Sequence, residues 1–371
     1  MAAIHPIRIL VLALENYLSA ARLPKALADG GFEVAAICYP DALISLTRYV
    51  DRKEVLPRDA DAAEVARRMI AIIDSWEPRL VIPADNRALR FLHHIVEVER
   101  SGVLPPALIR LVKESLPDPA AFAVATDKRV AAALMHRLGF DVPEWRPIAS
   151  IREAEAFAEE IGFPVILKPE GGQAGEGVAI CGNAEDLRAA RLEGEGGWFV
   201  QRFIVGRPAE ASGIAWQGKL LGAILYERIE VNPPETGMTC VARVIENATM
   251  TAGLAAMAKA TRHNGILSLG WMLEAETGSA FFLEANARSV PIVGPSGKLG
   301  LNLCECLRAR LAGAPQPVPD PAAPRLIALY PQELHRDPNS PYREHLLDEP
   351  VDDPLVHQAM QRGIEMLARR G

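Results

Sequence analysis

The sequence has few cysteines, no excess of basic residues and no long hydrophobic run. Five cysteines among 371 residues are an odd number at scattered positions, which argues against a disulfide framework and favours buried or half-buried thiols in a reducing cytoplasm. A net charge of −7 gives no electrostatic footprint for nucleic acid. The apolar run at 7–14 is too short to span a bilayer and lacks the flanks of a signal peptide. We therefore expect a cytoplasmic protein with no nucleic-acid or membrane partner.

Several catalytic and cofactor-binding patterns are also missing. No G-x-G-x-x-G follows the first apolar run, so a nicotinamide-dependent oxidoreductase is a weak hypothesis. The glycine-rich stretch at 163–180 does not match G-x-x-x-x-G-K-[ST], which excludes a P-loop. No Ser–His–Asp or Cys–His pattern indicates a protein nucleophile, and His93, His94 and His263 are predicted to have packing or surface roles. The chemistry must come from other motifs.

The first 115 residues or so alternate buried-strand runs with amphipathic helices, beginning with the strand at 7–14. This alternation predicts a parallel α/β sheet. Ligands of such sheets bind beyond the carboxyl ends of the strands, so Glu15, Asn16 and the residues at 83–86 are candidates for a small-molecule edge. The alternative is that Asp85 or Asn86 only caps the next helix.

Composition divides the remainder of the chain. A proline-rich lead-in precedes helices and a strand–loop–strand unit, and after Gly197 the pattern changes to successive antiparallel strands. A proline-rich stretch at 312–324 is typical of a linker. We predict a parallel α/β domain at 1–118, a small subdomain with the glycine-rich loop at 119–196, a second subdomain at 197–311, and a linker and tail at 312–371.

The loop in "FPVILKPEGGQAGEGVAI" is suited to anions. Lys168 ends a strand just before Gly171, Gly172, Gly175 and Gly177. Glycines let backbone N–H groups converge on a phosphate, and the lysine adds a point charge. A flexible hairpin connection explains the glycines equally well.

Three more side chains carry weaker signals. Lys128 stands in the first turn of a predicted helix, where the helix dipole disfavours a cation, although a solvated surface lysine is the simpler interpretation. In "WFVQRFIVGRPAE", Gln201 and the extended backbone around it could bind an adenine edge, and Glu210 could hold ribose hydroxyls. A strand–turn–strand with surface charges fits this segment as well.

The segment "LGWMLEAETGSAFFLEANARS" predicts two strands joined by a tight turn. Alternation along the second strand places Glu284, Asn286 and Arg288 on one face, together with Phe282. If the turn consists of Thr277 and Gly278, Trp271 lies opposite Glu284. A carboxylate among large apolar groups is costly unless a cation or Arg288 offsets it, which favours a binding site over a solvated surface.

Taken in this order, "TDKRVAAALMHRLGFDVPEW", "FPVILKPEGGQAGEGVAI", "FVQRFIVGRPAE" and "FFLEANAR" resemble the ATP-grasp superfamily, and most closely its carboxylate–amine ligases. The resemblance covers roughly residues 7–311. It implies an ATP-grasp fold, α/β and α+β in class, behind an amino-terminal parallel α/β domain.

The resemblance also implies roles for individual residues. Lys128 and Lys168 would bind ATP phosphates, and the loop at 171–177 would close over them. Gln201, Arg202 and Ile204 would line the adenine pocket, and Glu210 would hold the ribose. Glu284 and Asn286 would ligate Mg²⁺, with Mn²⁺ as an alternative. Arg288, with Lys168, would be catalytic and would stabilise the transferred phosphoryl group.

The implied reaction joins two small molecules. A carboxylate attacks the γ-phosphate of ATP to give an acyl phosphate and ADP, and an amine then displaces phosphate. Positioning and neutralisation of negative charge are what phosphoryl transfer requires, and lysines, an arginine and a metal provide both. A homodimer is the general expectation for such a protein.

One departure from the family pattern concerns the metal. Members commonly place a third ligand on the strand paired with the glutamate strand, and the assumed register puts Trp271 there. Glu284 would then bridge ions alone, Glu227 or Glu246 would substitute, or the metal site would be degraded. The last case describes a non-catalytic nucleotide- or metabolite-binding homologue.

The substrate pocket cannot be derived from the sequence. Arg228, Thr236 and Arg243 in "ERIEVNPPETGMTCVARVIE" are candidates for substrate contacts, and a β-hairpin with an exposed proline turn is the alternative.

Overall fold

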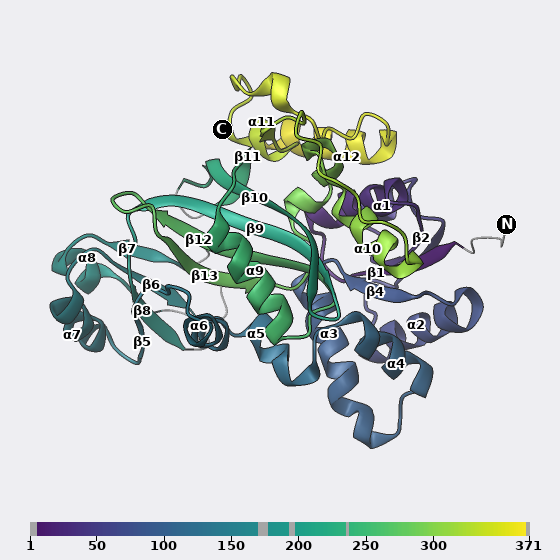
Figure 1. Cartoon of the computed structure of the whole chain (residues 1–371), viewed down its shortest axis with the longest axis horizontal. Helices are drawn as coiled ribbons and strands as arrows, with labels where there is room; N and C mark the ends of the chain where they lie inside the picture. The colour runs from purple at the N-terminus through teal and green to yellow at the C-terminus, as the bar shows by residue number, and fades with distance from the viewer. Residues whose placement is uncertain (1–5, 170–176, 193–196, 235–236, 369–371) are drawn as a thin grey trace.

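The computed structural model describes residues 6–169, 177–192, 197–234 and 237–368. Figure 1 shows the amino-terminal part on the right, a large sheet in the centre, a small sheet on the left and the carboxyl-terminal segment at the top. None of the helices in the described part of the chain has the length and apolar character needed to cross a membrane.

The amino-terminal part is the predicted parallel sheet, with strand order β3-β2-β1-β4. Its strands are β1 (Ile7–Ala13), β2 (Phe32–Cys38), β3 (Arg52–Val55) and β4 (Leu80–Pro83). Its helices are α1 (Leu18–Asp29), α2 (Ala62–Trp76), α3 (Asn86–Glu97) and α4 (Pro106–Ser115). Successive β1 residues are buried in two different clusters, one with α1 and the other with α2, α3 and α4. Burial of both faces explains the uninterrupted apolar run at 7–14.

The small antiparallel sheet has the order β5-β8-β6-β7. Its strands are β5 (Trp145–Ile148), β6 (Val165–Pro169), β7 (Ala179–Cys181) and β8 (Trp198–Arg202). Helices α7 (Ile151–Ile161) and α8 (Ala184–Ala189) supply the other half of its core. Two helices precede this unit, α5 (Phe122–Thr126) and α6 (Lys128–Arg137), and Asp127 caps α6 by accepting from the Arg129 N–H.

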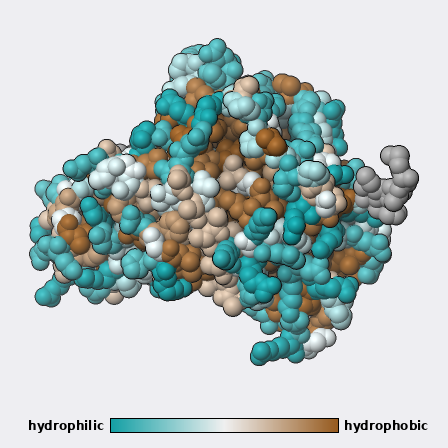
Figure 2. Space-filling model, in the orientation of Figure 1, coloured by the Kyte–Doolittle hydropathy of each residue, from teal (hydrophilic) through white to brown (hydrophobic). Residues whose placement is uncertain are grey.

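The large sheet has the order β13-β12-β9-β10-β11-β14 and is antiparallel. Its strands are β9 (Gly206–Trp216), β10 (Lys219–Asn232), β11 (Met238–Val244), β12 (Gly265–Glu274), β13 (Ala280–Asn286) and β14 (Leu326–Ala328). Helix α9 (Ala248–Ala260) packs on one face, and its outward side is rich in alanine, visible as pale brown surface in Figure 2. The other face packs at one end against α10 (Leu303–Ala312) and the amino-terminal sheet.

The β12–β13 hairpin differs from the predicted register. The turn is longer than the assumed two residues, since β12 ends at Glu274 and β13 begins at Ala280. The register then shifts, so that Trp271 pairs with Phe282 whereas Gly270 pairs with Glu284. Leu283 is therefore an extra residue on β13, and such a bulge reverses the faces of the residues on its two sides. The predictions that Trp271 lies opposite Glu284, and that Phe282 shares its face, were wrong.

The carboxyl-terminal segment packs against both the large sheet and the amino-terminal part. Residues 313–325 form no helix or strand, as expected for a linker by composition. The chain then adds β14 to β11, followed by α11 (Gln332–Arg336) and α12 (Pro354–Ala368). Residues of this segment pack against α1. All five cysteines are buried free thiols, as predicted.

Candidate functional site

Lys168 and Gln201 lie side by side on the face of the small sheet opposite to α7 and α8. Val165 and Leu167 point into the core of that sheet, so alternation along β6 turns Lys168 to the opposite side. The Lys168 ammonium donates to Oε1 of Gln201 at 2.6 Å. Burial and, after it, the charge of Lys128 lower the pKa of Lys168 to about 8, while Glu284 acts in the other direction. Four predicted site residues from four different elements therefore interact here.

Lys128 and Glu284 form the link between α6 and β13. The Lys128 Nζ lies 3.9 Å from Oε2 of Glu284, and both side chains are only partly exposed. The amide of Asn286 donates to Oε1 of the same glutamate at 3.4 Å. Lys128 is thus not the solvated surface lysine of the simpler interpretation. An anion between Lys128 and Lys168 would meet two cations and one carboxylate.

The face of the large sheet that carries Glu284 changes character along its strands. Near α10 it is apolar, with residues such as Ile214 and Ile266 in the core. Further along the same strands it is polar, with a run of side chains across four strands: Tyr226, Glu210, Ser212, Ser268, Glu284 and Asn286. The polar half of the sheet therefore forms the floor of the site.

Glu210 belongs to this floor and is held by its neighbours on β10. The Tyr226 hydroxyl donates to Oε2 of Glu210 at 2.6 Å, and Arg228 Nε lies 4.0 Å from Oε1. Ser268 Oγ, 2.8 Å from Ser212 Oγ, is 3.4 Å from the same carboxylate. The ribose-binding role expected of Glu210 stays a prediction.

The carboxylates expected to substitute for a third metal ligand lie elsewhere. Glu227 is buried and pairs with Arg207 at 2.7 Å on the face opposite to Glu210. Glu246 is exposed and pairs with Arg325 at 3.4 Å. Among the described residues, no three Asp, Glu, His or Cys side chains gather as a metal site. The predictions of Glu227 and Glu246 as substitutes were therefore wrong.

The connection between β8 and β9 holds the residues expected at the adenine. Ile204 is buried, and Arg202 lies 3.6 Å from Glu144 and 4.0 Å from Glu274. Gly177 has a φ of +72°, which favours glycine, and lies over Pro169 and Trp198. Gly171, Gly172 and Gly175 lie outside the described residues. Adenine and phosphate binding by these residues stays a prediction.

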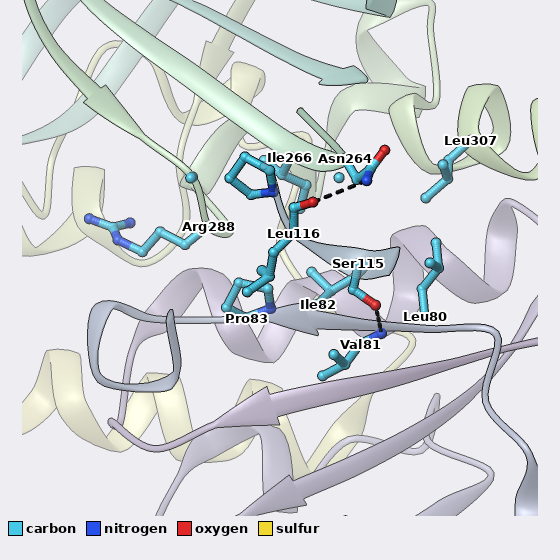
Figure 3. Close-up of a pocket in the computed structure, with 13 residues that line it drawn as sticks. Leu80, Val81, Ile82, Pro83, Ser115, Leu116, Asn264, Ile266, Arg288 and Leu307 are labelled. Atoms are coloured by element: carbon cyan, nitrogen blue, oxygen red, sulfur yellow. Dashed lines mark hydrogen bonds between the residues drawn. The ribbon is translucent and has the colours of Figure 1, made fainter. Parts of the chain in front are cut away.

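Arg288 is directed toward the amino-terminal sheet. Its Nε donates to Oδ1 of Asn86 at 2.7 Å, and its guanidinium carbon lies 4.9 Å from the centre of the Tyr17 ring. Both partners follow carboxyl ends of parallel strands, where the sequence predicted a ligand edge. Figure 3 shows the guanidinium turned away from a small, mostly apolar cavity that extends between β4 and the start of β12.

The other residues of the predicted edge have structural partners. Asp85 caps α3 by accepting from the Ala88 N–H, and it also accepts from the N–H groups of Leu14 and Glu15. Asn16 accepts from the Leu43 N–H at 3.1 Å. Capping is thus what Asp85 does, whereas Asn86 contacts Arg288.

Of the remaining candidates, some have structural roles and one lies at the site. His93 is buried and stacks on Phe122, and buried His263 bonds the Ile266 carbonyl, both of which are packing roles. Arg228 reaches the floor of the site, whereas Arg243 is exposed beside β14. Thr236 lies outside the described residues, and β10 and β11 form the hairpin of the alternative interpretation.

Sequence reasoning missed Tyr226, Ser212 and Ser268. Ser268 is a polar residue between two leucines, Ser212 lies between Ala211 and Gly213, and Tyr226 follows an apolar run. These polar residues are visible in the sequence, but a shared site could be inferred only from the strand register, which places the three side chains on one face.

Comparisons with known proteins agree with this architecture. The family model "Carbamoyl-phosphate synthase L chain, ATP binding domain" matches residues 127–196. The biotin carboxylase domain of 2-oxoglutarate carboxylase from Hydrogenobacter thermophilus, a dimer in complex with MgADP, ADP and bicarbonate, superposes with a TM-score of 0.61 at 19% identity. That match covers 83% of this chain and 70% of the other. The chain has the ATP-grasp fold.

Two further proteins are similar to this chain over different shares of their own lengths. The arginine-specific large chain of carbamoyl phosphate synthase from Neurospora crassa is 28% identical over 228 residues, which cover 54% of this chain and 19% of that protein. The ATP-grasp protein thus matches only about a fifth of that relative's length. The L-amino acid ligase from Bacillus licheniformis superposes with a TM-score of 0.55 at 16% identity, covering 84% of this chain and 75% of the other.

Proposed function

We propose that this ATP-grasp protein is an ATP-dependent ligase that couples a small carboxylic acid to an amine. The observation that supports the proposal is the meeting of Lys128, Lys168 and Glu284 between the two antiparallel sheets. In the first step a substrate carboxylate oxygen attacks the γ-phosphorus of ATP, and the bond to the β-phosphate oxygen breaks to release ADP. In the second step the amine attacks the acyl carbon, phosphate leaves, and the amine loses a proton.

The two lysines would hold the phosphates. Lys168 is directed by Gln201 and Lys128 by Glu284, so each ammonium is positioned before the nucleotide arrives. Prepositioned cations stabilise charge that develops during phosphoryl transfer without reorganising at that moment. The adenine would lie against Gln201, Arg202 and Ile204, with the loop at 171–177 over the phosphates.

Glu284 and Asn286 fit a bound Mg²⁺ or Mn²⁺. A carboxylate and an amide oxygen on adjacent positions of one strand face are hard oxygen ligands, and Mg²⁺ is commonly bound by one or two carboxylates together with phosphates and water. When bound, the ion would neutralise the β- and γ-phosphate oxygens. Glu284 would also hold Lys128 in place.

The substrate acid would lie beside Arg288. Asn86 and Tyr17 hold the guanidinium at the junction of β13 and the amino-terminal sheet. The likeness to an L-amino acid ligase supports a small acid such as an amino acid. A homodimer is also proposed, on the basis that the 2-oxoglutarate carboxylase domain forms one.

Binding of ATP followed by a product screen tests the proposal. We expect calorimetric titration with ATP and Mg²⁺ to show binding, and a screen over pairs of amino acids and other small acids and amines to show phosphate release that needs both partners. Failure of ATP to bind with or without Mg²⁺ would refute the nucleotide site.

Glu284→Ala provides the sharper test of the site. Removal of the carboxylate deletes a metal ligand and the partner of Lys128, so we expect turnover to be lost while the circular dichroism spectrum and melting temperature are retained. Glu246→Ala, which removes an exposed carboxylate that pairs with Arg325 and not with a lysine of the site, is the matched control. Undiminished turnover in Glu284→Ala would remove the metal assignment.

A second candidate function is favoured by one observation. The residue opposite Glu284 on β12 is Gly270, which has no side chain to offer a metal. A nucleotide-binding homologue with a reduced metal site would bind ATP, yet no acid–amine pair would release ADP and phosphate.

A further inference from the structure

Gly270 occupies the centre of the polar floor. It pairs with Glu284 of β13 on one side and with Glu210 of β9 on the other. Alternation along β12 places Ser268 and Met272 on the same face, since Leu269, Trp271 and Leu273 are in the core beneath α9. At position 270 the middle strand therefore brings no side chain to a face where both neighbouring strands have a glutamate.

The backbone does not require glycine at this position. The φ angle of Gly270 lies outside the left-handed region. A Cβ built there would meet the flexible Cγ of Glu284 at 3.1 Å and the Glu284 backbone only at 3.9 Å and beyond. A side chain at 270 could thus be accommodated by a small shift of Glu284, and it would project directly over the floor.

The neighbouring polar groups are already engaged. The carboxylate of Glu210 accepts from Tyr226 at 2.6 Å and faces Arg228, so its charge is balanced by β10 rather than open to a cation. Ser268 bonds Ser212. Of the described side chains on the floor, Glu284 is the carboxylate turned toward the two lysines, and Lys128 lies 3.9 Å from it.

We propose that this floor binds a single divalent cation, and binds it only together with a nucleotide. One carboxylate that pairs with Lys128 and one neutral amide make a weak site alone, because affinity for hard divalent cations depends on the number of charged ligands. Phosphates that draw Lys128 away and add their own oxygens complete the site. Gly270 is the residue that limits the site to one ion. The nucleotide-dependent half of this inference rests on the proposed function.

Mn²⁺ titration followed by electron paramagnetic resonance tests the inference on the full chain. For the native protein we expect almost no Mn²⁺ binding without nucleotide, and one Mn²⁺ per chain in the presence of ADP or a non-hydrolysable ATP analogue. For Gly270→Glu we expect Mn²⁺ affinity without nucleotide to rise by roughly tenfold or more, since a second carboxylate then faces Glu284.

Two variants serve as controls. Gly270→Ala adds a Cβ without a ligand and should titrate like the native protein, which separates ligation from a change in the backbone. Gly270→Glu combined with Glu284→Gln should lose the gained affinity if the two carboxylates act on the same ion. Melting temperatures establish that each variant is folded.

The outcomes separate this inference from the proposed function. Two Mn²⁺ per native chain with nucleotide, tight Mn²⁺ binding without it, or no gain in folded Gly270→Glu would each overturn the inference. Nucleotide binding is measured independently in the presence of a chelator. If no nucleotide binds, the proposed function fails, while the nucleotide-free comparison of Gly270→Glu with the native protein still decides the role of Gly270.

Discussion

At the scale of single residues, the surroundings of Lys168 set both the position and the pKa of its ammonium group. Its ammonium donates to Gln201, and burial together with Lys128 lowers its pKa to about 8, whereas Glu284 opposes the shift. A lysine in ordinary surroundings remains charged well above this pH. The charge of Lys168 thus depends on pH within a range that is accessible to experiment.

We predict that affinity for ATP measured without metal is constant below about pH 8 and falls at higher pH, by at most about tenfold per pH unit. The sign follows because bound phosphate favours the charged ammonium, so protons must be taken up on binding once free Lys168 has lost its charge. Calorimetry in buffers of different ionisation enthalpy measures this uptake. Lys168→Met should bind more weakly and lose most of the pH dependence; an unchanged pH profile in that variant would show that Lys168 is not the titrating group.

The β12–β13 hairpin illustrates, at the scale of one element, what the sequence could predict and what it could not. Apolar runs and their alternation predicted both strands, as well as the shared face of Glu284 and Asn286. The register could not be predicted, because a longer turn and the extra residue Leu283 are set by packing beneath α9 rather than by local propensity. Because the observed register differs from the predicted one by one residue, Trp271 lies in the core and not in the site.

Trp271 is therefore predicted to be a stability residue. It is fully buried, with Phe140 and Phe282 edge-on to its ring and Gly253 of α9 directly beneath it. Trp271→Ala should lower the free energy of unfolding by about 3–5 kcal/mol, the range for large aromatic truncations. Urea titration measures the loss. The Mn²⁺ stoichiometry of the folded variant should be native, and a changed stoichiometry would return Trp271 to the metal site.

At the scale of the whole molecule, the amino-terminal sheet, the large sheet and the carboxyl-terminal segment are joined by contacts that no local sequence pattern indicates. The parallel domain was predictable because each of its strands and helices has a strong periodic signal. The hydrogen bond from Arg288 to Asn86 was not predictable, since the two residues are distant in sequence and no local pattern relates them. The pairing of β14 with β11 could not be predicted either, because the residues before β14 have the composition of a linker.

The carboxyl-terminal segment is held to α1 by a buried ion pair. Arg22 and Asp348 are almost fully buried against each other, and Asp348 also accepts from the Tyr330 N–H at 2.8 Å. Asp348→Ala should destabilise the protein by about 3–5 kcal/mol, because the arginine is left buried without a counter-ion. Thermal and urea unfolding measure the loss.

A double variant identifies the cause of that loss. Arg22→Met with Asp348→Leu removes both charges and should recover much of the stability, since an apolar pair of similar volume often replaces a buried ion pair at little cost. If the double variant is as unstable as Asp348→Ala, the carboxylate matters for its bond to Tyr330 and not for its charge.

The pairing of Arg22 with Asp348 also has a consequence for biosynthesis. Helix α1 leaves the ribosome long before Asp348, which is more than three hundred residues further along the chain. Until then the guanidinium of Arg22 has no anionic partner at this position and keeps its hydration. We therefore expect the nascent amino-terminal sheet to form with α1 incompletely docked, and the final packing of that helix to wait for the synthesis of Asp348.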